Sequence, residues 1–549
     1  MVLKDLGSPD WWRQAVVYQI YPRSFADSNG DGIGDLPGIT SRVPYLRELG
    51  IDAVWLSPFY PSALADGGYD VADYRNVDPR LGTLDDFDAM TAALHEAGIK
   101  LVVDIVPNHT SDQHEWFQAA LAAAPGSPER ARYHFHEGKG PAGDEPPNDW
   151  RSHFGGGVWE RVTEADGTPG QWYLHFFARE QPDLNWDNPE VRADFEQTLR
   201  FWSDRGVDGF RIDVAHYLTK DLSEPFAPYE EVLLGENVRT HGHPFSDRDE
   251  VHDIYRAWRA VFDEYTPPRV AVAEAWVHRS RVARYASPEG LGQSFNFDLL
   301  LAEFDAAEFR TVITDSLELA AESGSSSTWV LSNHDVVRHA TRYGLPRGSG
   351  RHAKDWVRSG GALEAVDVDL GGRRARAATM LMLALPGSSY LYQGEELGLQ
   401  EVGDIPGESR QDPTYFRTNG EEFGRDGCRV PLPWTKDGQS FGFGSGGAHL
   451  PQPAWFGDYA VAVEEQDRDS TLNLYRKALQ LRTDLQAGEE LTWLEHPSPD
   501  VLTFARPNGW RSVTNFGTEP VELPDGDVLL ASGEITGRTL PGTTTVWMR

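Results

Sequence analysis

The sequence predicts an α/β protein: a (β/α)8 TIM barrel with a small domain inserted after the third strand and an antiparallel β domain at the C-terminus. Short apolar segments alternate with helix-like segments over most of the 549 residues, as in a parallel sheet that is covered by helices. A segment rich in Gly, Pro and His interrupts the alternation once, and a strand-rich pattern replaces it near the C-terminus. The length fits a barrel, because α/β barrels exceed the roughly 100–200 residues of ordinary domains.

Seven short apolar segments end in polar or charged residues, and we interpret them as strands. They are 15–22, 52–58, 100–109, 209–216, 269–276, 327–335 and 388–396. A weaker eighth candidate, QSFNFDLL at 293–300, completes the number that a barrel needs. In this fold the residues at the C-terminal ends of the strands form the active site.

The segments between these strands have apolar residues at three- and four-residue spacing, which predicts helices. They are 39–50, 84–98, 188–206 and 373–387. A glycine follows several of them, which is a signal for a helix C-terminus.

Two segments break the alternation and define the predicted domains. Residues 111–180 would be an unusually long loop without structure of their own, so we expect an inserted domain there. After a helix near 467–486, period-two alternation with Gly, Pro and Asn turns indicates a small β-sandwich. The predicted domains are the first part of the barrel, the inserted domain, the second part of the barrel and the C-terminal domain, at 1–110, 111–180, 181–486 and 487–549.

Composition excludes several classes of partner. The formal net charge of −35 repels nucleic acids and anionic membranes, so neither is expected to bind. No apolar segment is long enough to span a membrane, and the N-terminal residues lack the pattern of a signal peptide. A single cysteine, Cys428, rules out an intrachain disulfide framework and favours a reducing compartment. We therefore expect a cytoplasmic protein.

Polar side chains gather at the C-terminal ends of four predicted strands. They are Asp104, Asn108 and His109; Arg211, Asp213 and His216; Glu274; and Asn333, His334 and Asp335. A single acid at a strand end can simply cap the following helix. Several acids on one rim each carry a desolvation cost, which charged partners or a functional role explain. In GFRIDV, Arg211 and Asp213 lie two positions apart and therefore on one face of the strand.

Acids at such a rim suit glycoside hydrolysis. That reaction needs two carboxyl groups that flank one bond, one as nucleophile or base and the other as acid, around a transition state of oxocarbenium-ion character. The rim offers two acids for these roles and a third that could bind substrate hydroxyl groups.

A separate motif, DSNGDGIGD, predicts a site for a divalent cation, Ca²⁺ or Mg²⁺. Its oxygen-bearing side chains are spaced between turn-forming glycines; they are Asp27, Asn29, Asp31 and Asp35. Oxygen donors at this spacing suit both ions. The loop departs from an EF-hand, because its twelfth position is Gly38 rather than Glu. A solvated acidic turn is the alternative interpretation.

Eight short motifs occur in a fixed order along the chain. They are VVYQIYPRSFADSNGDGIGDLPGI (16–39), GGYDVADY (67–74), DIVPNH (104–109), QPDLNW (181–186), GFRIDVAH (209–216), AEAW (273–276), LSNHD (331–335) and GRDGCRVPLPW (424–434). With these motifs the sequence resembles the α-amylase family, glycoside hydrolase family 13, and within it the bacterial α-glucosidases and oligo-1,6-glucosidases. The resemblance implies an exo-acting, retaining α-glucosidase that acts by double displacement on maltose, maltooligosaccharides and isomaltose.

The resemblance also implies roles for the residues at the rim. Asp213 would be the nucleophile that forms a glucosyl ester, and Arg211 would hold it ionised and oriented. Glu274 would be the general acid and then the base, and Asp335 would bind hydroxyl groups of the reacting sugar.

The remaining implied roles concern the binding of that sugar. His109 and His334 would donate hydrogen bonds to ring hydroxyl groups, and Tyr69 would stack beneath the ring. Asp70 and Arg425 would form an ion pair that closes the pocket behind the first sugar. The resemblance also implies that the DSNGDGIGD loop holds one structural divalent cation, with the Ile33 carbonyl as a further ligand, and no organic cofactor.

Other readings remain open at this stage. The chain could be an oligo-1,6-glucosidase, or a trehalose synthase or sucrose isomerase, in which a sugar rather than water resolves the glucosyl ester. Transport-associated heavy chains resemble the same family but carry a membrane span and lack the catalytic acids. The motifs do not determine the natural substrate, the extent of transglucosylation, the metal or the oligomeric state.

Overall fold

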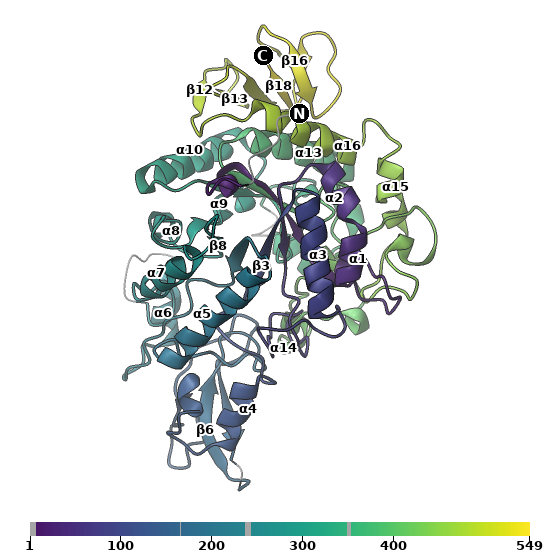
Figure 1. Cartoon of the computed structure of the whole chain (residues 1–549). Helices are drawn as coiled ribbons and strands as arrows, with labels where there is room; N and C mark the ends of the chain where they lie inside the picture. Colours follow the sequence, from purple (N-terminus) through teal and green to yellow (C-terminus); the bar gives the residue numbers. More distant parts are fainter. Residues whose placement is uncertain (1–6, 165, 237–242, 349–352) are drawn as a thin grey trace.

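The computed structural model describes residues 7–164, 166–236, 243–348 and 353–549. The described residues form an eight-stranded parallel sheet that curls into a nearly closed barrel, in the order β10-β11-β1-β2-β3-β7-β8-β9 (Figure 1). Its strands are β1 (Val16–Ile20), β2 (Ala53–Leu56), β3 (Lys100–Ile105), β7 (Gly209–Ile212), β8 (Val270–Ala273), β9 (Gly292–Ser294), β10 (Thr328–Val330) and β11 (Ser388–Tyr392). The predicted (β/α)8 barrel is confirmed.

The barrel closes at its weakest predicted strand. A strand was expected over 293–300, but β9 ends at Ser294 and helix α9 (Phe297–Leu301) follows. The strand ends there because the Asn296 side chain accepts the first free N–H groups of α9. The Thr328 hydroxyl of β10 donates to the Ser294 carbonyl at 2.6 Å and accepts the Asn296 N–H at 3.1 Å. A side chain thus joins β9 to β10 and completes the ring.

Alternate residues of each strand point into the barrel, and their polarity changes along its axis. One end holds an apolar cluster that includes Val17, Ala53 and Val102. Towards the C-terminal ends, the same faces carry Asp104 and Arg211, which are direct partners in the β3–β7 register. The period-two pattern therefore brings charged side chains together inside the barrel at one end only.

Helices cover the outside of the barrel. Besides α9 and the helix of the inserted segment, the described α-helices are α1 (Leu36–Ser41), α2 (Val43–Leu49), α3 (Leu84–Glu96), α5 (Pro189–Asp204), α6 (Tyr229–Glu236), α7 (Val251–Phe262), α8 (Arg279–Tyr285), α10 (Ala306–Ser323), α11 (His339–Arg342), α12 (Lys354–Arg358), α13 (Val368–Ala384), α14 (Pro413–Arg417), α15 (Val461–Glu464) and α16 (Thr471–Leu485). The helix predicted at 39–50 is divided between α1 and α2 at Arg42, and the one predicted at 373–387 begins earlier, at Val368. Asp367 caps that earlier start by accepting the Leu370 N–H.

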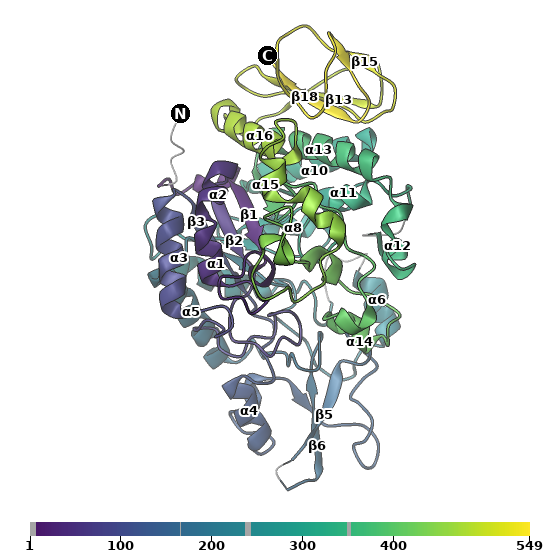
Figure 2. The same cartoon turned by 90° about the vertical axis from the view of Figure 1, so that its right-hand side faces the viewer.

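The inserted segment between β3 and β7 contains α4 (Glu115–Ala122), β4 (Phe135–His136), β5 (Trp159–Thr163) and β6 (Pro169–Leu174). Its strands form a sheet in the order β4-β6-β5. Figures 1 and 2 show it at the end of the barrel opposite the C-terminal sheet. Because it leaves the barrel from the C-terminal end of β3, it covers the end at which the charged side chains gather.

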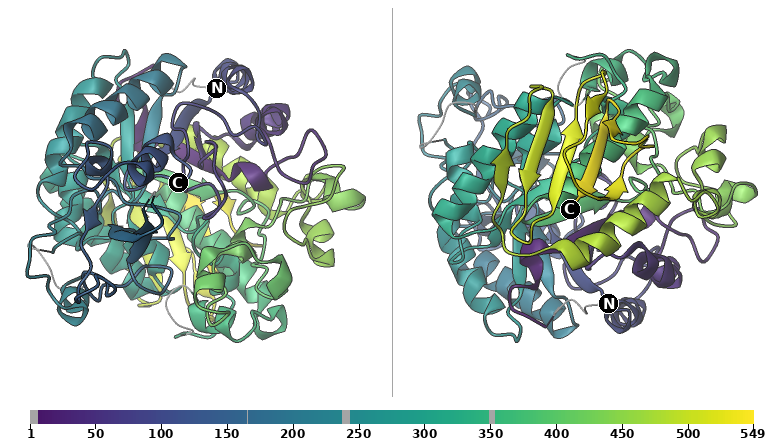
Figure 3. Two further views of the ribbon diagram at one scale, coloured as in Figure 1. Left: turned by 90° about the horizontal axis from the view of Figure 1, so that it is seen from below. Right: turned by 90° about the horizontal axis from the view of Figure 1, so that it is seen from above.

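The C-terminal strands form a five-stranded antiparallel sheet in the order β12-β13-β14-β18-β16 and a short β15–β17 pair. They are β12 (Thr492–Leu494), β13 (Val501–Ala505), β14 (Arg511–Asn515), β15 (Val521–Glu522), β16 (Val528–Ala531), β17 (Thr539–Leu540) and β18 (Thr544–Met548). The sheet packs on α13, where Trp547 Nε1 donates to the Met380 carbonyl at 3.1 Å. Figure 3 shows it, in yellow, in front of the barrel when the molecule is seen from above.

Among the helices of the described ranges, none combines the length and the apolar character that crossing a membrane requires.

We predict that Thr328→Val weakens the closure of the barrel. The variant keeps the shape of the side chain but leaves the Ser294 carbonyl and the Asn296 N–H without their partner. The free energy of unfolding, measured in urea, should fall by about 1–3 kcal/mol. Thr311→Val, on the exposed face of α10, is the matched control and should change it by less than about 0.5 kcal/mol. Equal effects of the two substitutions would contradict this account of closure.

Candidate active site

One buried guanidinium lies at the centre of the charged cluster. Arg211, on β7, is 2% exposed, and its Nη1 donates to Asp104 Oδ1 at 2.8 Å and to Asp213 Oδ1 at 2.7 Å. Its Nη2 donates to Glu274 Oε2 at 2.5 Å. Arg211 therefore joins acids from three neighbouring strands and holds Asp213 and Glu274 side by side.

The charges of this cluster do not balance. Burial raises the pKa of Asp104 to about 7, against the pull of Arg211. Burial also raises the pKa of Asp213 well above its ordinary value, and the neighbouring carboxyl groups Glu274 and Asp104 add to this. A single cation cannot offset three buried carboxylates, so the cluster retains a proton near neutral pH that belongs to the group as a whole.

The turn after Asp213 ties the two carboxyl groups together. Val214 has a φ of 34°, which is strained for a β-branched residue and typically costs about 1–3 kcal/mol. In this conformation its N–H donates to Glu274 Oε2 at 3.1 Å, and the Ala215 N–H donates to the Glu274 carbonyl at 2.8 Å. The strained turn thus connects the end of β7 to the end of β8.

A chain of hydrogen bonds orients His334. Gln19 Nε2 lies 2.7 Å from His334 Nδ1, and Tyr69 Oη lies 2.6 Å from His334 Nε2. Tyr69 Oη also donates to Asp104 Oδ2 at 3.1 Å, which requires Nε2 of the histidine to carry the proton. Burial lowers the pKa of His334 well below its ordinary value, so the ring is neutral. The Tyr69 ring lies parallel to the His334 ring, with centroids 5.2 Å apart.

Asp335 is the most open of the three predicted catalytic acids. Its side chain is 28% exposed, and its Oδ1 accepts hydrogen bonds from Arg425 Nη1 at 3.1 Å and Arg429 Nη2 at 2.9 Å. Although burial acts to raise it, the pKa of Asp335 lies below its ordinary value because His334, Arg425 and Arg429 face the carboxylate. Asp335 is therefore a fixed negative charge at the rim of the cluster.

The predicted ion pair between Asp70 and Arg425 is wrong. Arg425 Nη2 pairs with Asp66 Oδ1 at 2.7 Å, and its Nε pairs with Asp412 Oδ2 at 2.5 Å. Asp70 is fully buried, and its Oδ1 accepts hydrogen bonds from the Ser62 hydroxyl at 2.7 Å and the Asp66 N–H at 3.2 Å.

Two glycines explain which aspartate meets Arg425. Gly67 and Gly68 have φ values of 60° and 110°, which glycine adopts readily. The Tyr69 N–H closes the turn on the Asp66 carbonyl at 2.9 Å. Asp66 and Asp70 consequently point in different directions, and burial raises the pKa of the inward one, Asp70, to about 6.

His109 lies beside the same turn. Its Nε2 is 3.1 Å from the Tyr69 carbonyl oxygen and 3.0 Å from Gln181 Nε2. Gln181 Nε2 in turn donates to Asp66 Oδ2 at 3.2 Å, so this side chain links the histidine to the Asp66–Arg425 pair. Burial lowers the pKa of His109 to about 4, which keeps its ring neutral.

Sequence reasoning missed several members of the site. They are Gln19, Asp66, Gln181, Asp412 and Arg429. Four had a visible signal: Gln19 and Gln181 belong to two of the ordered motifs, Asp66 directly precedes the GGYD motif, and Arg429 shares a motif with Arg425. Asp412 lies outside these motifs and meets the site through its contact with Arg425.

The predicted metal loop has suitable donors. Asp27 Oδ1, Asn29 Oδ1 and Asp31 Oδ1 each accept the backbone N–H two residues ahead, so successive side chains turn into the loop. Asp35 also caps α1, because its Oδ1 accepts the Gly38 N–H. Among the described residues, no three His, Cys, Asp or Glu side chains gather as a metal cluster. An ion would therefore also draw on the Asn29 amide and the Ile33 carbonyl, and the site stays a prediction.

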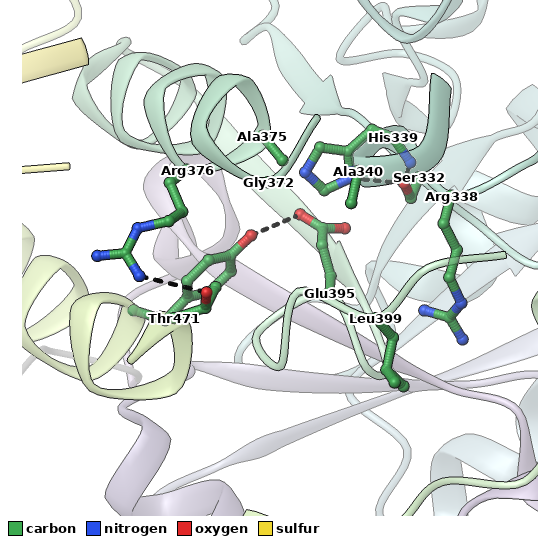
Figure 4. Close-up of a pocket in the computed structure, with 11 residues that line it drawn as sticks. Ser332, Arg338, His339, Ala340, Gly372, Ala375, Arg376, Glu395, Leu399 and Thr471 are labelled. Carbon is green, nitrogen blue, oxygen red and sulfur yellow. Dashed lines mark hydrogen bonds between the residues drawn. The ribbon is translucent and has the colours of Figure 1, made fainter. Parts of the chain in front are cut away.

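A separate small cavity lies next to α13 and α16 (Figure 4). Its lining includes Glu395, which accepts a hydrogen bond from Tyr475 at 3.3 Å, and His339, which is bound to Ser332 at 2.8 Å. Burial raises the pKa of Glu395 to about 8. The volume of about 10 Å³ has room for about one water molecule, so this cavity is too small for an organic substrate.

Comparisons with known proteins agree on one family. Residues 19–489 match the family model described as Alpha amylase, catalytic domain. A probable alpha-glucosidase of Rhizobium meliloti (strain 1021) is 38% identical, over 91% of this chain and 88% of its own length. An oligo-1,6-glucosidase of Parageobacillus thermoglucosidasius is 33% identical, over 94% and 92%. The crystal structure of an alpha-glucosyl transfer enzyme, XgtA, has a TM-score of 0.82 at 35% identity and covers 98% of this chain and 99% of its own.

We predict that EDTA lowers the melting temperature of the protein and that excess Ca²⁺ or Mg²⁺ restores it. Binding at a hundredfold excess over Kd stabilises the folded state by about 2.7 kcal/mol. Asp31→Ala should melt lower in the absence of EDTA and should no longer respond to the chelator. Asp437→Ala, a surface aspartate outside the loop, should melt and respond like the parent protein. If EDTA did not change the melting temperature of the parent protein, the prediction of a structural cation would be wrong.

We predict that Asp70→Asn stabilises the protein near pH 7. The folded pKa of Asp70, about 6, lies above the ordinary value of 3.8, so the folded state holds a proton that the unfolded state releases. The parent protein therefore loses stability as pH rises from about 4 to about 6, and the loss stays constant above that range. The asparagine keeps the oxygen acceptor without this loss and should gain about 1–3 kcal/mol in urea unfolding at pH 7.

Asp66→Asn is the matched control for this substitution. It removes the charge that faces Arg425 and should destabilise the protein at pH 7, because a partly buried guanidinium then loses one of its carboxylate partners. A gain in Asp66→Asn together with a loss in Asp70→Asn would restore the pairing first expected from the sequence.

Proposed function

The chain belongs to the alpha-amylase family of glycoside hydrolases, and on this premise we propose that it is a retaining α-glucosidase that removes α-glucose from the non-reducing end of short α-glucosides. The proposed substrates are maltose, maltooligosaccharides and isomaltose. The observation that carries the proposal is the pairing of Asp213 and Glu274 on the two terminal nitrogens of Arg211. Retaining enzymes need two carboxyl groups only about 5–5.5 Å apart, and a shared guanidinium favours that short separation.

In the first half of the proposed reaction, Asp213 attacks the anomeric carbon of the terminal glucose and forms a covalent ester. Glu274 donates its proton to the glycosidic oxygen as the bond to the aglycone breaks. The proposal places one proton of the Arg211 cluster on Glu274 and leaves Asp213 ionised, while Arg211 stays cationic and holds the attacking carboxylate in place.

In the second half, water takes the position of the departed aglycone. Glu274, now ionised, removes a proton from the water, whose oxygen attacks the anomeric carbon and releases Asp213. Two inversions at one carbon return the α-anomer. Asp335 faces the hydroxyl groups of the reacting ring as an ionised carboxylate, because Arg425 and Arg429 prevent it from becoming a proton donor.

Exo action follows from the wall behind the reacting sugar. The Asp66–Arg425 pair lies beside Asp335, and the Phe154 ring of the inserted segment packs over the Arg425 guanidinium at 5.0 Å. Segments from β2–α3, the inserted segment and the 412–429 loop meet there, which supports a closed pocket that admits one chain end. A cleft open on both sides would suit internal cleavage of long glucans.

The linkage and the acceptor are the finer parts of the proposal. Similar proteins include an alpha-glucosidase, an oligo-1,6-glucosidase and an alpha-glucosyl transfer enzyme, so oligo-1,6-glucosidase is the second candidate. A glucosyl-transferring isomerase of the trehalose synthase or sucrose isomerase type is the third. All three would form the glucosyl ester. The two glucosidases release it with water and differ in the linkage that they cleave, whereas the isomerase transfers the glucosyl group to a sugar. The proposed structural cation, held by the loop from Asp27 to Asp35, would support the fold and take no part in these steps.

The proposal is tested with a panel of maltose, isomaltose, trehalose, sucrose and soluble starch. We expect glucose as the sole product from maltose and isomaltose, poor activity on starch, and initial release of the α-anomer in proton NMR. Initial β-glucose would refute retention, and early internal cleavage of starch would refute exo action. Rearranged disaccharides as the main products would favour the isomerase.

We predict that Asp213→Asn lowers kcat by several orders of magnitude on every substrate of the panel. The amide cannot form the ester, and the loss of a covalent nucleophile affects each substrate alike. Asp70→Asn is the control, because it changes a neighbouring buried acid that has no role in the proposed steps. Turnover of Asp213→Asn within about tenfold of the parent protein would assign the nucleophile elsewhere.

A further inference from the structure

We propose that Trp276 forms one wall of the leaving-group site and positions the oxygen of Glu274 that carries the transferred proton. The proposal rests on the function proposed above and deepens it: the preferred aglycone presents the flat face of a ring. Trp276 lies two residues after Glu274 in the AEAW motif, and none of the proposed steps uses it.

The two oxygens of Glu274 have different surroundings. Oε2 accepts hydrogen bonds from the Arg211 guanidinium at 2.5 Å and from the Val214 N–H at 3.1 Å. A proton on Oε2 would face these two donors, one of them cationic. The protonated form of Glu274 therefore carries its proton on Oε1, and Oε1 is the atom that meets the glycosidic oxygen.

Trp276 contacts this same oxygen. Its Nε1 donates to Glu274 Oε1 at 3.1 Å, so the carboxyl group is held from both ends and cannot rotate freely. The indole must also lie close to the leaving group, because the glycosidic oxygen binds Oε1 and the aglycone is attached to that oxygen. Because both contact Oε1 or the oxygen bound to it, the Trp276 ring and the first ring of the aglycone lie next to each other.

The Trp276 indole is exposed, which is rare among the large hydrophobic side chains of the described residues. Trp276 is 37% exposed, and the described residues include only two other exposed large hydrophobic side chains, Phe416 and Val528. Its ring stacks on Phe297 with centroids 3.8 Å apart and planes within 5° of parallel. Phe297 is 8% exposed and begins α9, so the indole rests on a rigid base.

A supported, exposed indole beside the acid is a suitable surface for a ring. Aromatic side chains contribute large apolar area in fixed orientation, and ligand sites combine such surfaces with a few polar groups. The pair of Trp276 and Phe297 would favour glucosyl or aryl aglycones over groups without a ring.

The test compares two substrates that differ only in the leaving group, maltose and α-glucosyl fluoride. Fluoride has no ring to stack and needs little help from an acid. Trp276→Leu should lower kcat/KM for maltose by about 10–100-fold, as expected for a lost apolar contact and hydrogen bond. It should leave kcat/KM for the fluoride within about threefold of the parent value, because kcat/KM reports only the steps up to the ester.

Trp276→Phe separates the two roles. It keeps a ring on Phe297 but removes the N–H, so KM for maltose should stay close to that of the parent while kcat falls about 3–10-fold, the value of one hydrogen bond. Trp12→Leu is the matched control: Trp12 also donates an indole hydrogen bond, to the Pro9 carbonyl, but it lies before β1 at the other end of the barrel. It should leave both substrates unaffected.

Two outcomes overturn the inference. Equal losses on maltose and fluoride in Trp276→Leu would mean a general structural role, and unchanged activity on both would mean that the indole lies outside the leaving-group site. Activity on the fluoride also shows that a variant is folded. A parent protein that cleaves neither substrate would instead refute the proposed function, so the two failures are distinguishable.

Discussion

The site depends on a single buried cation that is shared by too many acids. Arg211 is surrounded by Asp104, Asp213 and Glu274 inside the barrel, and no second cation contacts these three carboxyl groups among the described ion pairs. Removing charges from water costs several kcal/mol per ion even after relaxation, so such a cluster persists only where the surrounding structure enforces it. Here the register of β3 and β7 and the strained turn at Val214 hold the carboxyl groups around Arg211. In the proposed reaction, this excess of acid over base leaves a proton available for transfer.

A second set of charges, with two cations rather than one for three carboxylates, lies beside the first. Arg425 and Arg429 both pair with Asp335, Arg425 also pairs with Asp412, and these two carboxylates stay ionised. Although burial opposes it, Arg425 and Arg429 lower the pKa of Asp412 to about 2. Adjacent clusters thus keep their acids in different protonation states by the ratio of cations to carboxylates. The proposed reaction uses both, with proton transfer at Glu274 and a fixed charge at Asp335.

The apolar residues that stabilise the barrel and the charged residues of the candidate site lie at opposite ends of the barrel axis. Its apolar interior and the C-terminal sheet lie away from the inserted segment, and the polar layer lies beneath that segment. The inserted segment reaches the polar layer through the Phe154 ring, which covers Arg425. Strain at Val214 and the unbalanced charges are therefore confined to the end where the strands finish, while the strands themselves keep a regular register.

Much of this protein was determined by local sequence pattern. Period-two alternation states which residues of a strand face the barrel interior, and the polar ends of four strands locate Asp213, Glu274 and Asp335 on one rim. The family resemblance supplied their roles, and it could do so because the motifs are local. The strand at 293–300 was too long in the prediction because nothing in the apolar pattern reveals that Asn296 caps a helix.

The tertiary structure decided which charges meet. Asp66 and Asp70 both lie near the GGYD motif, and only the glycine turn between them, with positive φ at Gly67 and Gly68, directs Asp66 towards Arg425. The partners of Arg425 come from segments up to several hundred residues apart, and no periodicity encodes such pairs. The contact of Trp276 with Glu274 Oε1 was equally invisible, because side-chain direction at a strand end depends on what packs behind it, here Phe297. The sequence thus determined the strands and helices and the residues that face the barrel interior. Packing between distant segments determined which charged side chains pair.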